Sequence, residues 1–244
     1  VTMKMTDVTR PARKLLNVKL KRCGAVIVAA GSASRMGGID KVMAPLGGEP
    51  MIARTVRAFQ ECDAISEIVV VTREDLIVPI GRLTRDIPKV TAVVAGGKSR
   101  QESVHLGLNA LSAKVKLAAI HDGARPFITW QLIDWVVRAA NSYGAAAPAI
   151  PVKDTIKEVQ GTIVKSTPDR ASLRAVQTPQ VFDFDLLRAA LKKAREDGAE
   201  VTDDCSAVER MGMSVKIVEG DERNIKITTP LDLKIGELLL EEMR

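Results

Sequence analysis

A short glycine-rich loop that carries two cations is the part of this 244-residue chain most suited to chemistry. An unbroken apolar run, residues 25–30, leads into Gly31, and the loop that follows carries Arg35 and Lys41. Glycines let backbone N–H groups approach an anion closely, and cations beside them complete a cradle for a polyphosphate. The loop predicts binding of a nucleoside triphosphate; the alternative is a plain strand-to-helix turn with two solvated cations.

The loop differs from the two commonest nucleotide-binding fingerprints. Ala33 stands where Gly-x-Gly-x-x-Gly requires its second glycine, which argues against a dinucleotide-binding start. Gly97-Lys98-Ser99 ends like a Walker A motif, but Ala92 occupies the position of the upstream glycine. Both fingerprints are rejected, which leaves Ala-Ala-Gly-x-x-x-Arg-Met-Gly followed by a lysine.

Two further clusters follow expected strands, and ligands of open α/β sheets bind at the carboxyl ends of strands. Gly96 and Gly97 permit close approach to a base or ribose, and the helix that contains Ser103 offers its N-terminus to an anion. Asp122 can hold a divalent cation or a ribose hydroxyl, and Arg125 can bind a phosphate. A simple loop and a turn aspartate are the plainer interpretations of these two clusters.

Polar clusters later in the chain carry little weight individually, because charged residues in such segments usually form a solvated face. They are Lys153-Asp154-Thr155, Pro168-Asp169-Arg170, Gln177-Thr178-Pro179-Gln180 and the segment Asn224–Thr228, which contains Lys226.

Strand and helix patterns alternate through most of the chain, which is typical of a parallel sheet with helices on both faces. The expected strands cover residues 25–30, 68–72, 90–95, 117–121, 145–150 and 214–218. The expected helices begin near Pro50, Arg100 and Thr129 and cover 184–196 and 203–210, with a last helix opened by Thr229 and Pro230. Pro148 argues for an edge position or a bulge in its strand.

Residues 151–178 lose this alternation and show short β-prone pieces around Gly161. We expect a hairpin-like excursion from the sheet, a projecting β-arm. Such an arm suits a contact between two copies of the chain, because an exposed strand edge otherwise risks aggregation. We expect a single domain over residues 23–244.

The net charge of +6 is concentrated at the N-terminus, where residues 1–22 hold seven cationic residues and one acid. The rest of the chain is therefore balanced, which argues against nucleic acid as a partner. We interpret residues 1–22 as a flexible basic extension without the apolar core of a signal peptide. No apolar run reaches the length of a membrane span, so no membrane contact is expected. Three separated cysteines suit a reducing cytoplasm.

Taken together, the motifs resemble the 2-C-methyl-D-erythritol 4-phosphate cytidylyltransferase family over roughly residues 23–240. His-Asp-Gly-Ala-Arg-Pro, Pro-Val-Lys-Asp-Thr-Ile-Lys, Thr-Pro-Gln and Asn-Ile-Lys-Ile-Thr are far more specific together than singly. The resemblance implies a Rossmann-like fold of the nucleotide-diphospho-sugar transferase type. It also implies CTP and a polyol phosphate as substrates, Mg²⁺ or another divalent cation, and a homodimer whose arm reaches the neighbouring active site.

The resemblance also assigns roles to individual residues. Arg35 and Lys41 would stabilise the transition state, and Arg170 and Lys226 would position the attacking phosphate. Nucleotide recognition would involve Ala30, Gly31, Gly96, Gly97, Ser103 and Asp122, with Asp122 near the ribose or the metal. Substrate contacts would come from Arg125, Thr155 and Thr178.

The sequence departs from the family pattern beside the catalytic lysine, where Asp40-Lys41-Val42 replaces the usual Pro-Lys-Gln. Lys98 and Arg223 also stand where other residue types are common, which affects loop geometry more than reaction class. Two alternatives stay open: a ribitol-5-phosphate cytidylyltransferase, and a non-catalytic nucleotide-binding sensor. A sugar-1-phosphate nucleotidyltransferase is less favoured, because we expect no added C-terminal domain.

Overall fold

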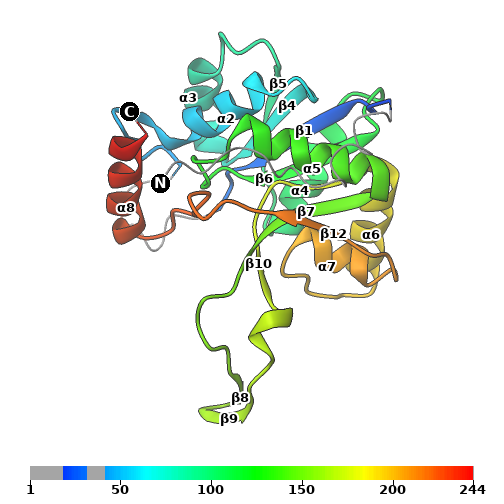
Figure 1. The fold of residues 1–244 in the computed structure, drawn as a ribbon. Helices are drawn as coiled ribbons and strands as arrows, with labels where there is room; N and C mark the ends of the chain where they lie inside the picture. The colour runs from blue at the N-terminus through cyan, green and yellow to red at the C-terminus, as the bar shows by residue number, and fades with distance from the viewer. Residues whose placement is uncertain (1–18, 32–41, 244) are drawn as a thin grey trace.

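The computed structural model describes residues 19–31 and 42–243, and the strands within them build one main sheet (Figure 1). The sheet order is β12-β7-β11-β6-β1-β4-β5, and β10 pairs with β7 beside β11. These strands are β1 (Cys23–Val28), β4 (Ile65–Thr72), β5 (Val90–Ala95), β6 (Leu117–Asp122), β7 (Ala145–Pro151), β10 (Arg174–Val176), β11 (Gln180–Asp183) and β12 (Lys216–Glu219). Among the described strands of this sheet, β10 and β11 pair antiparallel with their neighbours and the other pairs are parallel. The predicted mostly parallel α/β sheet is confirmed.

Helices cover both faces of this sheet. The first face carries α2 (Met51–Glu61), α3 (Ile77–Leu83), which follows a 3₁₀ turn η1 (Glu74–Leu76), and α5 (Trp130–Tyr143). The second face carries α4 (Arg100–Ala110), α6 (Phe184–Glu196) and α7 (Asp204–Glu209). At one end, α8 (Pro230–Glu242) packs near a small ribbon of β2 (Pro45–Leu46) and β3 (Glu49–Pro50).

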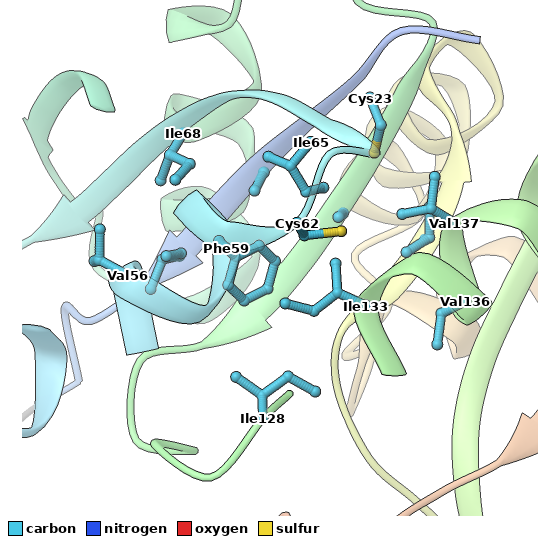
Figure 2. Packing of buried hydrophobic residues seen from close by; sticks show 14 of the residues in the cluster. Cys23, Val56, Phe59, Cys62, Ile65, Ile68, Ile128, Ile133, Val136 and Val137 are labelled. Carbon is cyan, nitrogen blue, oxygen red and sulfur yellow. The ribbon is translucent and has the colours of Figure 1, made fainter. Parts of the chain in front are cut away.

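The core consists of two apolar layers, one on each face of the sheet. Successive side chains of a strand point to opposite faces, so Ile27 of β1 joins the layer under α2 and α5, and Val26 joins the layer under α4 and α6. Figure 2 shows the first layer, where Phe59 and Ile133 lie among side chains from β1, β4 and the two helices. Burial on both faces of the sheet explains why the sequence of β1 belongs to an unbroken apolar run.

Threonine side chains cap the starts of α5 and α8, and the cap predicted at Thr229 is confirmed. The Thr129 side chain accepts the N–H of Leu132 at the start of α5. At α8, Thr229 and Asp232 form a reciprocal capping box behind Pro230. These local hydrogen bonds fix where each helix begins and therefore where the preceding loop ends.

The edge position expected from Pro148 is wrong. β12 pairs with one side of β7, and β10 and β11 pair with the other, so β7 lies inside the sheet. The alternative of a bulge fits better. Between the stretch of β7 that pairs with β10 and the stretch that pairs with β11, four residues (177–180) lie opposite only two residues of β7 (147 and 148). The Gln177 N–H donates to the Pro148 carbonyl there at 2.7 Å.

Between β7 and β10 the chain leaves the sheet as the expected arm, which projects far from the body in Figure 1. At its tip β8 (Glu158–Gln160) and β9 (Ile163–Ser166) pair antiparallel, and Gly161 turns the chain with φ of 60°. Every residue of both strands is exposed, including the apolar Val159, Ile163 and Val164. A 3₁₀ turn, η2 (Arg170–Ser172), lies on the returning side.

The first described residues, 19–22, already lie against the domain. Lys21 donates its N–H to Asn141 Oδ1 and pairs through Nζ with Asp183, both at 3.0 Å. Residues 1–18 of the predicted basic extension lie outside the described residues. No helix in the described parts of the chain is long and apolar enough to cross a bilayer.

Candidate active site

A cavity of about 310 Å³ opens at the carboxyl ends of β1 and β6 and beside the loop after β5, where the predicted clusters meet. Parallel pairing brings these strand ends to one edge of the sheet, with Val28 of β1 beside Asp122 of β6. The sequence-predicted residues that line the cavity are Ala30, Gly31, Gly97, Ser103, Asp122 and Lys226.

The loop between β5 and α4 lies close against the end of β1. A Cβ added to Gly96 would overlap the Cβ of Ala30, so this approach requires glycine. The Ser103 hydroxyl accepts the Gly97 N–H at 3.1 Å and donates to the Ser99 carbonyl at 2.9 Å. Ser103 therefore fixes the loop that lines the cavity, and its predicted nucleotide contact stays a prediction.

A cluster of opposite charges surrounds Asp122. Lys226 Nζ lies 2.7 Å from Oδ2, Arg125 Nε lies 3.8 Å from the same oxygen, and Arg100 Nε lies 3.7 Å from Oδ1. Burial alone raises the pKa of Asp122, but Lys226 and Arg100 outweigh burial and lower that pKa below its ordinary value. The carboxylate is therefore ionised, and cations in excess give the cavity wall a positive charge that suits a polyphosphate.

Thr178, His121 and Arg125 lie behind Asp122. The Thr178 hydroxyl accepts the Asp122 N–H at 3.1 Å and lies 3.0 Å from His121 Nδ1. Burial lowers the pKa of His121 to about 3, so its ring is neutral. Arg125 Nη1 donates to the Asn224 carbonyl at 2.7 Å, which ties β6 to the segment that carries Lys226. Predicted substrate contacts of Thr178 and Arg125 stay predictions.

Two predicted residues lie on the arm and do not line this cavity. Thr155 is exposed between β7 and β8. Arg170 is exposed on η2, where Nη1 donates to the Lys153 carbonyl at 2.8 Å, and it borders a separate open hollow of about 560 Å³. Arg35 and Lys41 lie outside the described residues. Their segment joins Gly31 to Val42, which both line the cavity.

Comparison with known proteins identifies the family. The profile of the 2-C-methyl-D-erythritol 4-phosphate cytidylyltransferases matches residues 23–242, nearly the whole chain. The chain belongs to this family. The resemblance drawn from the motifs and the predicted nucleotidyltransferase class are thereby confirmed.

Individual relatives agree with this cytidylyltransferase assignment in sequence and in fold. The 2-C-methyl-D-erythritol 4-phosphate cytidylyltransferase of Symbiobacterium thermophilum is 46% identical over 219 residues, covering 89% of this chain and 92% of its own. The crystal structure of the 4-diphosphocytidyl-2C-methyl-D-erythritol synthase of Anaerococcus prevotii covers 91% of this chain and 96% of its own, at a TM-score of 0.83 and 32% identity. The cytidylyltransferase structure from Thermus thermophilus covers 90% and 99%, at a TM-score of 0.75 and 35% identity.

An ion pair that the sequence did not reveal supports the cavity of this cytidylyltransferase. Arg100, a lining residue, donates from Nη2 to Asp204 Oδ2 at 2.8 Å. Asp204 begins α7 and is almost fully buried. Burial raises the pKa of Asp204, and Arg100 opposes that rise. In sequence, the pair Asp203-Asp204 signals only a helix start, so this partner of Arg100 could not be recognised.

The site of this cytidylyltransferase fits a divalent cation that takes most of its ligands from the substrate. Asp122 Oδ1 lies beyond hydrogen-bond distance of Arg100, which leaves this oxygen available to a cation. Among the described residues, no three His, Cys, Asp or Glu side chains gather as a metal cluster. Mg²⁺ commonly binds through one or two carboxylates together with substrate phosphates and water, and such a site needs no cluster.

Proposed function

We propose that this chain transfers a cytidylyl group from CTP to 2-C-methyl-D-erythritol 4-phosphate in the non-mevalonate route to isoprenoid precursors. The products would be 4-diphosphocytidyl-2-C-methyl-D-erythritol and pyrophosphate. The observation that carries this proposal is the gathering of Asp122, Lys226 and Arg100 beside the glycine loops at one sheet edge. Membership of the cytidylyltransferase family supports the substrates.

In the proposed reaction, an oxygen of the polyol phosphate attacks the α-phosphorus of CTP in line. The bond from that phosphorus to the bridging oxygen breaks, and its electron pair leaves with pyrophosphate. The nucleophile is already an anion, so the site needs cations that align two polyanions and stabilise the charge of the transition state. Lys98, Arg100 and Lys226 supply such charge in the cavity, and Arg35 and Lys41 would add theirs.

We propose Mg²⁺ as the cofactor, held by Asp122 together with phosphate oxygens of CTP. When bound, the ion would neutralise part of the phosphate charge. Lys226 Nζ lies against the Asp122 carboxylate at 2.7 Å, so this lysine stands where it can turn from Asp122 to a phosphate of the substrates. Asp122 would thus be shared between the lysine and the cation.

We also propose that the enzyme works as a homodimer in which the arm of one copy reaches the cavity of the other. The apolar side chains exposed on the arm support this, as does the position of Arg170 away from the cavity of its own copy. Mixing two impaired variants, Arg170→Ala and Lys226→Ala, tests the idea at a polyol phosphate concentration well below the KM of the Arg170→Ala variant. Hybrid dimers would hold one site with both residues intact, so activity should rise on mixing. Refolded mixtures no more active than the separate variants would place Arg170 outside the partner's site.

Pyrophosphate release from CTP in the presence of Mg²⁺ tests the whole proposal, with 2-C-methyl-D-erythritol 4-phosphate and ribitol 5-phosphate in parallel reactions. Release that depends on the methylerythritol phosphate is the expected result. Release with ribitol phosphate alone would keep the reaction class and reject the proposed substrate. No release with either, from folded protein, would favour a nucleotide sensor.

A further inference from the structure

A chain of buried hydrogen bonds runs beneath Asp122, and His121 stands at its centre. The Asp122 N–H donates to Thr178 Oγ1 at 3.1 Å, and Oγ1 lies 3.0 Å from His121 Nδ1. On the other side of the ring, Nε2 lies 3.3 Å from the Arg125 carbonyl oxygen. His121 is completely buried, and its ring packs against Phe59 with centroids 4.9 Å apart. The ring is therefore held in place by packing as well as by hydrogen bonds.

The partners of the His121 ring determine the donor and the acceptor of each hydrogen bond in this series. A carbonyl oxygen can only accept, so Nε2 must carry the hydrogen that bonds to Arg125. A neutral imidazole then has no hydrogen on Nδ1, so the Thr178 hydroxyl donates to it. With its hydrogen directed to His121, Thr178 Oγ1 presents a lone pair to the Asp122 N–H.

We propose that His121 is a positioning residue for the cytidylyl transfer: its Nε2–H tautomer orients the Thr178 hydroxyl, which holds the backbone of Asp122 and aims its carboxylate at the cavity. The reaction named here rests on the proposed function. The hydrogen of the Thr178 hydroxyl is already bonded to His121 Nδ1, so Thr178 cannot donate a hydrogen bond to a phosphate oxygen. Toward a substrate it can act only as an acceptor.

Thr178 also anchors the opposite side of the site. Its carbonyl accepts from Asn224 Nδ2 at 3.0 Å, and Asn224 stands two residues before Lys226. The Asp122 and Lys226 segments are thus both fixed to Thr178, whose side-chain orientation depends on His121. The side chain of Thr178 thus holds the Asp122 segment and its backbone carbonyl holds the segment of Lys226, whose Nζ lies 2.7 Å from Asp122.

Nitrogen NMR of the histidine rings tests which group donates in each of these hydrogen bonds. The protein has only His105 and His121, so ¹⁵N-histidine labelling gives two sets of ring signals. We expect His121 to be the Nε2–H tautomer with a hydrogen-bonded Nδ1, and the Nδ1 signal to move in Thr178→Val. A wild-type ring protonated on Nδ1, or an Nδ1 signal unchanged in the variant, overturns the proposal.

Activity measurements test the positioning role. Thr178→Val is nearly isosteric and should lower kcat by about 10- to 100-fold, the range found for outer-shell partners of metal ligands, since Asp122 is the proposed Mg²⁺ ligand. Thr178→Ser keeps the hydroxyl and should recover most of the lost kcat. Thr84→Val is the matched control. Thr84 also has a buried hydroxyl that donates a hydrogen bond, in its case to the Ile80 carbonyl at 2.9 Å, and it lies away from the cavity. Equal kcat losses in the two valine variants overturn the proposal.

The two readouts separate this proposal from the proposed function. If Thr178→Val does not fold, the tautomer of the wild-type ring still shows which group donates in each hydrogen bond of the series. The ring spectrum requires no substrate. An inactive wild-type enzyme would therefore reject the proposed function, whereas a wrong tautomer would reject the positioning role of His121.

Discussion

Replacing Asp204 by asparagine removes the charge that balances Arg100 while keeping the shape of the side chain. The two groups are 2.8 Å apart, and the Asp204 side chain is only 2% exposed. Removing one partner of a buried ion pair costs about 3–5 kcal/mol, because the other charge stays buried without compensation. Arg100 keeps 32% of its side chain exposed and has Asp122 at 3.7 Å, so we expect the lower end, about 3 kcal/mol.

Urea unfolding followed by circular dichroism measures this loss. Lys193→Gln is the matched control, because it breaks a pair of similar length, 2.7 Å to Asp197, on the exposed face of α6. That change should cost less than about 1 kcal/mol. The double variant Arg100→Met, Asp204→Leu should recover most of the stability by replacing the ion pair with apolar contact, and it should lose activity because Arg100 lines the cavity.

A loss below about 1 kcal/mol in Asp204→Asn would refute the reasoning, because it would mean that Arg100 and Asp204 do not form a buried pair of opposite charges. A double variant no more stable than Asp204→Asn would refute it as well. In that case the cost would come from packing around α7 and not from an unbalanced charge.

Three further predictions concern residues with different tasks. Lys41→Ala should lower kcat by about 10²–10³ in folded protein, the usual cost of losing one preorganised contact to a transition state; near-normal pyrophosphate release would remove Lys41 from the mechanism. Arg170→Ala should raise KM for the polyol phosphate and leave KM for CTP largely unchanged, so a rise confined to CTP would contradict its role. Because burial lowers the pKa of His121 to about 3, the unfolded chain takes up this proton below about pH 6.5 and the folded chain does not. Lowering the pH from 7.5 to 5 should therefore reduce the free energy of unfolding by about 2 kcal/mol through His121 alone. Urea unfolding should show a weaker pH dependence of this free energy in His121→Gln than in the wild type. Equal pH dependence in the two proteins would reject this prediction.

Most of the main sheet could be predicted because burial on both faces leaves a strong signal. β1, β4 and β6 are largely buried apolar runs, whereas β5 lies at the edge of the sheet and is mostly half-buried. Each of the four was expected within a few residues of its observed bounds. Helix starts were equally readable, because caps such as Thr229 act through local hydrogen bonds.

Shorter or interrupted elements were missed for physical reasons. β11 is four residues long and enters the sheet antiparallel between β6 and β7, and no periodicity in so short a segment reports strand direction. α3 contains Pro79 and Gly81, which both disfavour a helix interior. The two-residue strands β2 and β3 exist only through their pairing.

At the site, the sequence could group residues that end neighbouring strands, since topology alone brings them together. It could not pair Arg100 with Asp204, which lie 104 residues apart, or His121 with Thr178, which lie 57 apart. Such contacts depend on side-chain packing between elements whose relative positions the sequence does not state. The roles of Arg35 and Lys41 rest on motif resemblance, because both lie outside the described residues.

The arm stands apart from the apolar core of its own copy, and this bears on how such enzymes diverge. Its hairpin places no side chain in either apolar layer, so substitutions there escape the stability cost that constrains the sheet. In the proposed dimer, the arm lies at the neighbouring active site, so its substitutions act on the contact between copies and on the substrate, and not on the folding of either copy. Changes in the arm can therefore alter which polyol phosphate is accepted while the nucleotide-binding edge stays intact.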